Sequence, residues 1–485
     1  MPGWTYEGSD HVVAGEAVVV GGERQLLMDS WVVADTAGCQ RVVHQPVRHE
    51  ANPLIVAGPE GGKCIGHANV IHDAARGVYQ MWTEGAIMRG SRAGRTHYHQ
   101  TYGRYFESTD GVDWEAPDLS LFEVEGIEDG NVFLADAERG VSPSVIETPT
   151  RWRERGKYLM VYDNGMMGRR DFAALPANGQ QQRLAFSDDG IRWQGSAEPI
   201  FRGQSDTHNN VCYNEERGVL MLYRRAPINA GEIRRIAYSE SADLIDWTQP
   251  RVIVSPDELD AHSLYGMTVS RYQGVYIGFL QQFYLADPLG GGMKPGKHMM
   301  VDVQLAWSRD GLNWSRHPGR PIFLETGPVG SYDWGMVYVG KGLIERDDRI
   351  DLYYTGWNFP HVPGEQRSHI CLAALRKDGF VSVGAPERGR LLTRPMVCPG
   401  GRLHVNLRAQ EGGGARVQVM RGDGAMDGHA VEGWGNELSG AVTGDVLDEV
   451  VGWGGSAEMG AMKGRTIRLL FEMERAEIYS FWFGT

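Results

Sequence analysis

The chain has 485 residues, more than one small domain requires, and 42% of them are hydrophobic, so it can bury a large core. Its 48 Lys and Arg stand against 62 Asp and Glu, a net charge of −14, and no basic run suggests a nucleic-acid footprint. The sequence contains no stretch of 18 apolar residues, so no membrane-spanning helix is expected.

The remaining composition favours a β-rich protein. Sixty-five Gly and 22 Pro imply many tight turns, and 14 Trp is a high count that is frequent in carbohydrate-active proteins, although most single Trp residues fill core positions. The five Cys are scattered without CxxC spacing, which disfavours structural zinc and a disulfide framework. The first 20 residues lack a basic segment followed by an apolar one. We therefore expect a cytoplasmic protein with reduced thiols.

The N-terminal residues 1–50 contain one or two strand patterns, such as "QLLMDSWVVAD", and a connector. One unit then recurs five times over residues 51–384. Each unit reads as an apolar or alternating strand, a polar turn, a second strand rich in Tyr, Met, Leu and Trp, and a third strand that runs into an Asp-Gly turn. A Trp then opens a fourth strand.

The turn carries the motif Ser-x-Asp-Gly-x-x-Trp. Copies start at residues 108, 187 and 308, a degenerate copy ("SESADLIDW") starts at 239, and a weaker one ("LRKDGFVSV") starts at 375. Asp-Gly suits a tight turn because Gly tolerates positive φ and Asp bonds nearby backbone amides. Since so many copies cannot all lie in one active site, we expect a structural role, with the Trp wedged between neighbouring units.

These patterns predict an all-β fold. Four-stranded units of this spacing are typical of the blades of a five-bladed β-propeller, predicted over residues 51–384. The last residues, 385–485, alternate apolar and polar side chains between Gly-rich turns without the blade signature. This pattern predicts a C-terminal β-sandwich.

Five blades followed by a β-sandwich resemble the glycoside hydrolase superfamily of families 32, 43, 68 and 130, the invertase and arabinanase relatives. The stretches "LLMDSWVVADTAGCQRVVHQPVRHEANPLI", "SDTHNNVCYNEERG" and "DLYYTGWNFPH" look like segments of uncharacterised family-32-like proteins. The resemblance covers roughly residues 24–485. It implies glycosidic-bond hydrolysis by carboxyl groups on inner strands around a central funnel.

The sequence departs from these relatives at two positions. "HEANPLI" has Asn52 where invertase relatives carry a nucleophilic Asp at the start of the first blade. "GVSPSVIE" has Ser142 where an Asp before Pro is expected in the second blade.

Acids remain elsewhere near predicted inner strands. Asp206 in "QSDTHNNV" and Asp333 in "SYDWGMV" are the predicted catalytic carboxyl pair, and Glu84 or Asp163 supplies a third acid. On a strand, Asp206 and His208 share one face, so His208 is a candidate catalytic base or acid.

Further polar and aromatic residues near the funnel are predicted to bind the sugar. An Arg at the funnel mouth would either bind a substrate carboxylate through two parallel hydrogen bonds or simply keep the surface soluble. A Trp beside an acid is suited to pack against a sugar ring. The predicted substrate-binding residues are Asn52, His67, Asn209, Arg225, Tyr265, Trp334, Trp357 and His361. No cofactor is expected. A divalent metal held by funnel histidines, with His97 and His99 as the closest-spaced pair, is the alternative.

The favoured function is therefore a glycoside hydrolase acting on an oligosaccharide or a glycan terminus, with carbohydrate as its partner and neither nucleic acid nor membrane involved. Two alternatives stay open. One is a polysaccharide lyase or other glycan-modifying enzyme that uses His and Tyr as acid and base, which the missing acids favour. The other is a non-catalytic sugar-binding propeller. The sequence leaves the sugar, the linkage and the oligomeric state open.

Overall fold

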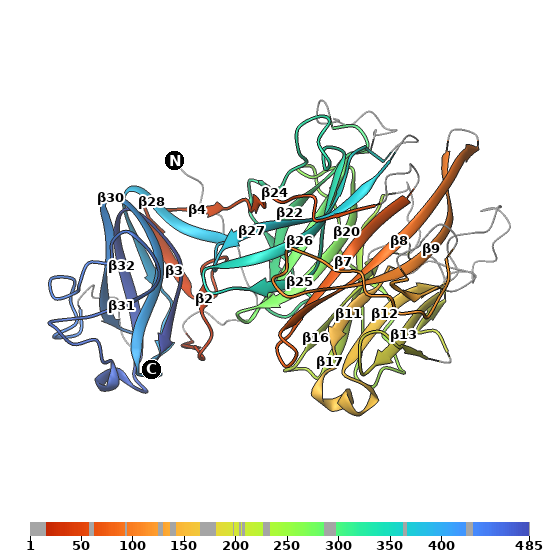
Figure 1. Ribbon diagram of the computed structural model, residues 1–485. Coiled ribbons are helices and arrows are strands. Elements are labelled where there is room, and N and C mark those ends of the chain that lie inside the picture. Colours follow the sequence, from red (N-terminus) through yellow and green to blue (C-terminus); the bar gives the residue numbers. More distant parts are fainter. Residues whose placement is uncertain are drawn as a thin grey trace.

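The computed structural model describes residues 16–57, 63–92, 95–124, 130–135, 142–164, 181–196, 198–202, 205, 209–226, 233–285, 297–361, 366–422 and 430–484. Regular structure in these ranges consists of β-strands and the short 3-10 helices η1 (Thr150–Arg155) and η4 (Gly460–Met462). The all-β class predicted from the sequence is therefore confirmed. Figure 1 shows two lobes, a larger one built from the middle of the chain and a smaller one built mainly from its C-terminal part.

Five successive groups of antiparallel strands build the larger lobe (Figure 1). Group 1 contains β7 (Lys63–Asp73), β8 (Val78–Arg92), β9 (Arg95–Ser108) and β10 (Val132–Leu134). Group 2 contains β11 (Ser144–Glu147), β12 (Tyr158–Asn164), β13 (Gln181–Ser187), β14 (Gln194–Gly195) and β15 (Phe201–Arg202). Group 3 contains β16 (Asn210–Asn214), β17 (Val219–Arg225), β18 (Ile236–Ser241) and β19 (Arg251–Val254).

Groups 4 and 5 repeat the pattern. Group 4 contains β20 (Ser263–Tyr272), β21 (Val275–Phe283), β22 (Val301–Ser308), β23 (Ser315–Arg316) and β24 (Ile322–Leu324). Group 5 contains β25 (Met336–Glu345), β26 (Arg349–Trp357) and β27 (Ser368–Arg376). Its outer strands come from the N-terminal part of the chain, because β5 (Val47–Arg48) and β6 (Ile55–Val56) both pair with β27. The two ends of the lobe's chain thus meet in one sheet.

The first strands of the five groups are joined in sequence by side-chain hydrogen bonds. In each of the first four groups, the first strand contains a polar residue followed by valine. The polar side chain forms a hydrogen bond with the backbone of the corresponding valine in the next group. The bonds join Asn69 Oδ1 to Val145 N (3.1 Å), Ser144 Oγ to Val211 N (3.0 Å), Asn210 Oδ1 to Val269 N (2.9 Å) and Thr268 Oγ1 to Val339 O (2.9 Å). A parallel bridge between Lys341 of β25 and Asn69 of β7 returns to group 1. The five first strands therefore form a closed ring.

The Ser-x-Asp-Gly turn is structural, as predicted. In the copy at 187, Asp189 Oδ1 accepts N–H bonds from Ile191 and Arg192, both at 2.8 Å, and the Ser187 hydroxyl at 3.0 Å. Corresponding bonds form around Asp110, Asp243 and Asp310. In the degenerate copy, Ser241 and Asp243 form the turn. Leu244 occupies the glycine position with a φ of 68°.

The weakest copy, at 375, is not such a turn, so that part of the repeat prediction is wrong. Its Asp378 is 1% exposed and accepts bonds from the Tyr272 hydroxyl (2.6 Å), the Ser480 hydroxyl (2.6 Å) and the Asn406 amide (3.2 Å). Tyr272 belongs to the larger lobe, whereas Asn406 and Ser480 lie on strands of the smaller lobe. Asp378 therefore links the two lobes.

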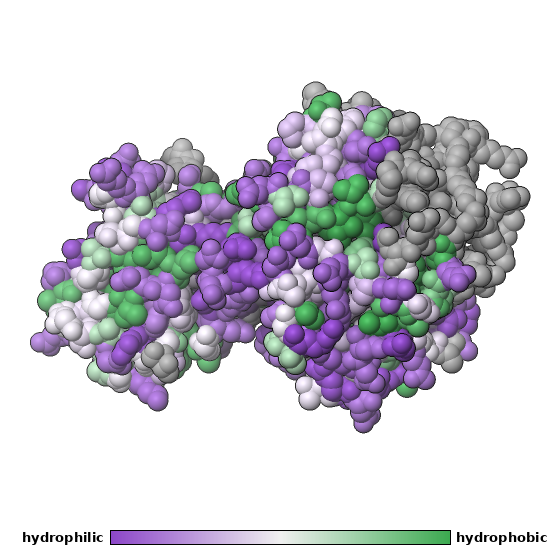
Figure 2. Space-filling view, in the orientation of Figure 1, coloured by the Kyte–Doolittle hydropathy of each residue, from purple (hydrophilic) through white to green (hydrophobic). Residues whose placement is uncertain are grey.

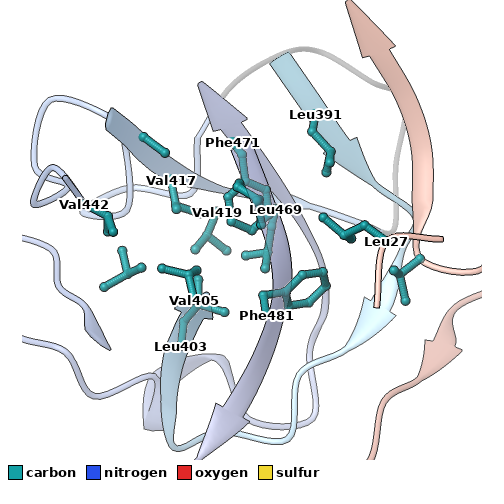
Figure 3. Close-up of a cluster of buried hydrophobic side chains, with 14 of the residues drawn as sticks. Leu27, Leu391, Leu403, Val405, Val417, Val419, Val442, Leu469, Phe471 and Phe481 are labelled. Carbon is teal, nitrogen blue, oxygen red and sulfur yellow. The ribbon is translucent and has the colours of Figure 1, made fainter. Parts of the chain in front are cut away.

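The smaller lobe is one nine-stranded sheet assembled from both ends of the chain. The N-terminal strands are β1 (Val18–Val19), β2 (Gln25–Leu26), β3 (Val33–Ala37) and β4 (Gln40–Val43). The C-terminal strands are β28 (Val381–Thr393), β29 (Met396–Val397), β30 (Arg402–Arg421), β31 (Asp445–Val451) and β32 (Thr466–Gly484). Alternate residues of β30 and β32, such as Leu403, Val405, Leu469 and Phe471, are buried and pack with Leu27 and Leu391 (Figure 3).

Polar residues cover most of the face in Figure 2, with smaller apolar groups between them. In the described ranges, no helix is long and apolar enough to cross a membrane.

Candidate functional site

Corresponding positions on the second strands hold the groups together at one end of the ring. Glu84, Asp163 and Arg225 each lie seven residues after a turn glycine with positive φ, namely Gly77, Gly156 and Gly218. Each of the three bonds the next group near the start of its first strand. Thr355 of β26 does the same, because its Oγ1 accepts the backbone N–H of His67 at 3.1 Å. First strands begin and second strands end here, so the polar side chains of several groups converge.

Glu84 lies on β8 and is 8% exposed. Its Oε2 accepts both the backbone N–H and the hydroxyl of Ser142, each at 2.7 Å. Oε1 has no hydrogen-bond partner within the described part of the chain. Ser142 stands where the families that the sequence resembles carry an acid. Here it orients Glu84 of the neighbouring group through Oε2, and Glu84 Oε1 stays available within the described residues.

Asp163 lies on β12, is 4% exposed and has both oxygens engaged. Oδ2 accepts the Asn209 amide at 2.5 Å and Oδ1 accepts the Gln182 amide at 3.1 Å. Burial lowers the pKa of the neighbouring Arg224 to about 10, while Asp163 acts in the opposite sense, so Arg224 remains charged at neutral pH. The structure thus brings together Asp163 and Asn209, both predicted site residues.

A stack of aromatic rings crosses the same end of the ring. The rings of Tyr265 and Tyr338 are stacked with centroids 5.5 Å apart, and His67 stacks on Tyr338 at 6.2 Å. The Tyr265 hydroxyl lies 3.1 Å from His361 Nε2, and the Arg225 guanidinium lies 5.0 Å from the centre of the Tyr265 ring. Four predicted substrate-binding residues, His67, Arg225, Tyr265 and His361, are therefore joined in one cluster with Tyr338.

Two members of this cluster were not foreseen. Tyr338 belongs to a continuous apolar run, residues 336–339, and looks like a core residue in the sequence. Arg234 Cζ lies 5.0 Å from the Tyr265 ring centre and 4.9 Å from that of Phe283. The available signal was the grouping of arginines at 224, 225, 234 and 235, two pairs close together in the sequence.

The predicted Trp platforms lie at different places. Trp357, at the end of β26, is 9% exposed and packs edge-on to Tyr338, so it belongs to the aromatic cluster. Its indole N–H has no hydrogen-bond partner within the described residues. Trp334 instead packs edge-on to Phe359 and against the group formed by Ala261, Tyr284 and Met300.

The placement predicted for Asp333, on an inner strand beside the funnel, requires correction. Asp333 precedes β25 and is 1% exposed. It accepts bonds from Arg48 Nε at 2.8 Å, the Tyr354 hydroxyl at 3.1 Å and the Ser331 hydroxyl at 3.0 Å. Burial opposes the charge of Arg48, but the bond and the attraction to Asp333 outweigh it and raise the pKa of Arg48. Because Arg48 lies on the outer strand β5, the carboxylate is held inside group 5 as an ion pair.

Asn52 also lies elsewhere than predicted. It falls between the outer strands β5 and β6, whereas the first strand of group 1 begins at Lys63. Its side chain donates to the backbone oxygen of Leu372 at 2.7 Å and accepts the Leu372 N–H at 2.8 Å. Asn52 therefore anchors the N-terminal segment to β27 and is not at the start of the first unit.

Asp206, a predicted catalytic acid, and His208, its predicted partner base or acid, lie outside the described residues. The side chains of His97 and His99 lie outside them as well. The described ranges hold no group of three His, Cys, Asp or Glu side chains that could bind a metal ion.

Comparison with known proteins gives weak likenesses. No family model matches the chain, and no curated protein does. A glycosyl hydrolase from Bacteroides ovatus has 13% identity over 69% of this chain and 94% of its own, with a TM-score of 0.47. A fructofuranosidase from Schwanniomyces occidentalis complexed with fructose has 12% identity over 90% and 97%, with a TM-score of 0.43. An N-acetylgalactosamine deacetylase from F. plautii has 14% identity over 71% and 97%, with a TM-score of 0.45. With all three TM-scores below 0.5, these likenesses establish neither the family nor the activity of this chain.

Proposed function

We propose that the chain is a glycan-active enzyme, a glycoside hydrolase whose site lies where the second strands end, on the axis of a five-bladed β-propeller followed by a β-sandwich. The closed ring of five first strands supports the propeller. The sequence resemblance to the family 32, 43, 68 and 130 relatives supports the reaction class. The site acts on an oligosaccharide or a glycan terminus.

The observation that carries this proposal is the carboxyl group of Glu84. Ser142 fixes it through one oxygen, and the other is available for proton transfer at a glycosidic oxygen. Asp163, the corresponding residue of the next group, stays on the same rim. A second carboxyl group is required on the opposite side of the scissile bond. Asp206 and Asp163 are the candidates, since Asp333 is engaged by Arg48.

The aromatic cluster then binds the sugar. Tyr265, Tyr338 and Trp357 present ring faces and edges beside polar groups of His67 and His361. Sugars bind through this combination, because their C–H faces pack on aromatic rings and their hydroxyl groups need fixed hydrogen-bond partners.

The test is a screen of chromogenic glycosides and oligosaccharides with the wild type, Glu84→Gln and Asp163→Asn. Loss of a general acid or base lowers kcat by roughly 100-fold or more, so Glu84→Gln should lose at least that much while the fold is retained. Glu147→Gln, an exposed acid at the end of β11, is the matched control. Unchanged kcat in both Glu84→Gln and Asp163→Asn would contradict the proposal.

One observation favours a second candidate, a lyase or another glycan-modifying enzyme. The Tyr265 hydroxyl and His361 Nε2 lie 3.1 Å apart, and such a pair can remove and return a proton without a carboxylate. A lyase acting on a uronic acid polymer creates an unsaturated bond that absorbs in the near ultraviolet. Appearance of that absorbance, abolished in Tyr265→Phe, would select this function over hydrolysis. If the protein binds a sugar but neither hydrolyses it nor cleaves it by elimination, it is a non-catalytic sugar-binding protein.

A further inference from the structure

A lysine projects into the middle of the first-strand ring. Lys341 lies between Gly340 and Gly342 on β25, at a bulge where the pairing with β26 shifts between Val339 and Leu343. The glycines are required, because a Cβ at Gly340 would come within 2.3 Å of Ala68 O, and one at Gly342 within 2.2 Å of Val70 O. Gly342 also has a φ of +101°. The Gly-Lys-Gly stretch therefore lets β25 press against β7 while the lysine faces a central cavity.

This cavity has a volume of about 30 Å³ and is lined by residues of all five first-strand segments. That is room for one water molecule or one monatomic ion, and not for a sugar. No Asp or Glu is among its described lining residues, and Lys341 has no ion pair in the described part of the chain.

Within the described residues, three lining side chains keep N–H or O–H groups that donate to no other residue. Lys341 Nζ donates one bond, to Val269 O at 2.6 Å, which leaves two of its three N–H groups. Asn210 uses its carbonyl oxygen on Val269 N, so its amide N–H groups remain. Ser144 Oγ accepts the Val211 N–H and keeps its own proton. Water accepts only two hydrogen bonds, whereas an anion accepts from all of these donors at once.

We propose that this cavity binds a monatomic anion such as chloride, held by Lys341, Asn210 and Ser144. The anion balances the charge of the lysine and ties group 5 to groups 2 and 3 across the ring. Burial alone lowers the pKa of Lys341, and a bound anion offsets this by favouring the charged form. The ion acts on stability and does not depend on the proposed catalysis.

Thermal unfolding at equal ionic strength in sodium chloride and in sodium gluconate tests the site. A ligand that binds only the folded state raises its stability, so the wild type should unfold about 2 °C or more higher in chloride. Lys341→Met should lose the difference. Lys463→Met removes the same charge from an exposed position in the smaller lobe and should keep it. An equal chloride response in the wild type and Lys341→Met, or no response in the wild type, would overturn the proposal.

A second variant and a direct measurement cover the case in which Lys341→Met does not fold. Asn210→Asp keeps the acceptor for Val269 N but supplies a carboxylate to Lys341, so its unfolding temperature should no longer depend on chloride. Crystals of the wild type soaked in bromide should show an anomalous peak beside Lys341 Nζ. Absence of that peak in well-diffracting crystals would likewise overturn the proposal.

Discussion

At the scale of single residues, two buried acids with similar sequence contexts have different environments. Glu84 and Asp333 both lie beside apolar strands and aromatic residues. Among the described residues, Glu84 is bonded by a neutral serine alone, whereas Asp333 is matched by the guanidinium of Arg48, 285 residues away in the sequence. A short motif cannot reveal a partner at that separation. Sequence reasoning therefore found acids near the axis but could not tell the ion-paired acid from the available one.

The ion pair of Asp333 should contribute to stability and not to catalysis. Of its partners in the described part of the chain, Arg48→Met leaves the buried carboxylate the Tyr354 and Ser331 hydroxyl groups. Breaking a buried pair costs roughly 3–5 kcal/mol, and because Arg48 is about one-third exposed we expect about 2 kcal/mol in urea unfolding. Asp333→Asn should lose a similar amount and keep its catalytic rate. A large loss of kcat at unchanged stability would instead make Asp333 a catalytic acid.

The substrate-binding predictions show the same limit. His67 and Tyr265 are predicted as polar or aromatic residues on inner strands. Arg225 and His361 are predicted because they lie near the expected funnel mouth. The structure joins all four in one cluster. Tyr338 was missed because it stands in a continuous apolar run that looks like the core of the sheet. Asn52 was misplaced because β5 and β6 pair with the last group and not with the first.

At the scale of elements, the Ser-x-Asp-Gly turn explains why the groups could be located from the sequence. Its hydrogen bonds join residues at most three apart in the sequence. All the partners therefore lie within the motif, and the turn can be predicted from the motif alone. The copy with Leu244 shows that the aspartate and serine define the turn even where the glycine is replaced. The failed copy at 375 shares the letters Asp-Gly, but its Asp378 binds distant residues, and no local pattern predicts that.

Asp310 provides the test of the turn. Burial raises its pKa, but the N–H groups of Asn313 and Leu312 and the Ser308 hydroxyl outweigh this and lower it. Asp310→Ala should cost about 1–2 kcal/mol at neutral pH, the usual cost of losing such a capping side chain. Because the folded-state pKa is lowered, this stabilisation is complete above about pH 4 and disappears as the pH falls through the lowered pKa.

Equilibrium unfolding of the wild type and Asp310→Ala between pH 2 and pH 7 measures the difference. Asp188→Ala removes an exposed carboxylate beside Asp189, in the corresponding turn of the copy at 187, and should change the stability by less than about 0.5 kcal/mol. A difference between Asp310→Ala and the wild type that did not change with pH would show that the charge of Asp310 is not what stabilises the turn.

At the scale of the whole molecule, the N-terminal segment joins both lobes. Strands β1–β4 pair in the smaller lobe, and β5 and β6 then complete group 5 of the larger one. The sequence predicted five repeats and a different C-terminal part because both have local patterns. It could not predict this crossing, because two-residue strands have no periodicity and their partners lie more than 300 residues away.

Asp378 is the buried hydrogen-bonding centre between the lobes, and its removal should uncouple them. Its carboxylate accepts bonds from Tyr272 of the larger lobe and from Asn406 and Ser480 of the smaller one. Its φ of 59° also suits Asp better than Ala. Asp378→Ala leaves these donors unsatisfied, so we expect a loss of about 3–5 kcal/mol.

Scanning calorimetry distinguishes this coupling from a local effect. In Asp378→Ala we expect the smaller lobe to unfold in a separate transition below that of the larger lobe, because a buried polar contact between the lobes is gone. Asp347→Ala, at an exposed position on the preceding turn, should keep the wild-type profile. If Asp378→Ala unfolds in the same profile as the wild type, other contacts couple the lobes, such as the ion pairs Arg309–Asp29 and Arg376–Asp445.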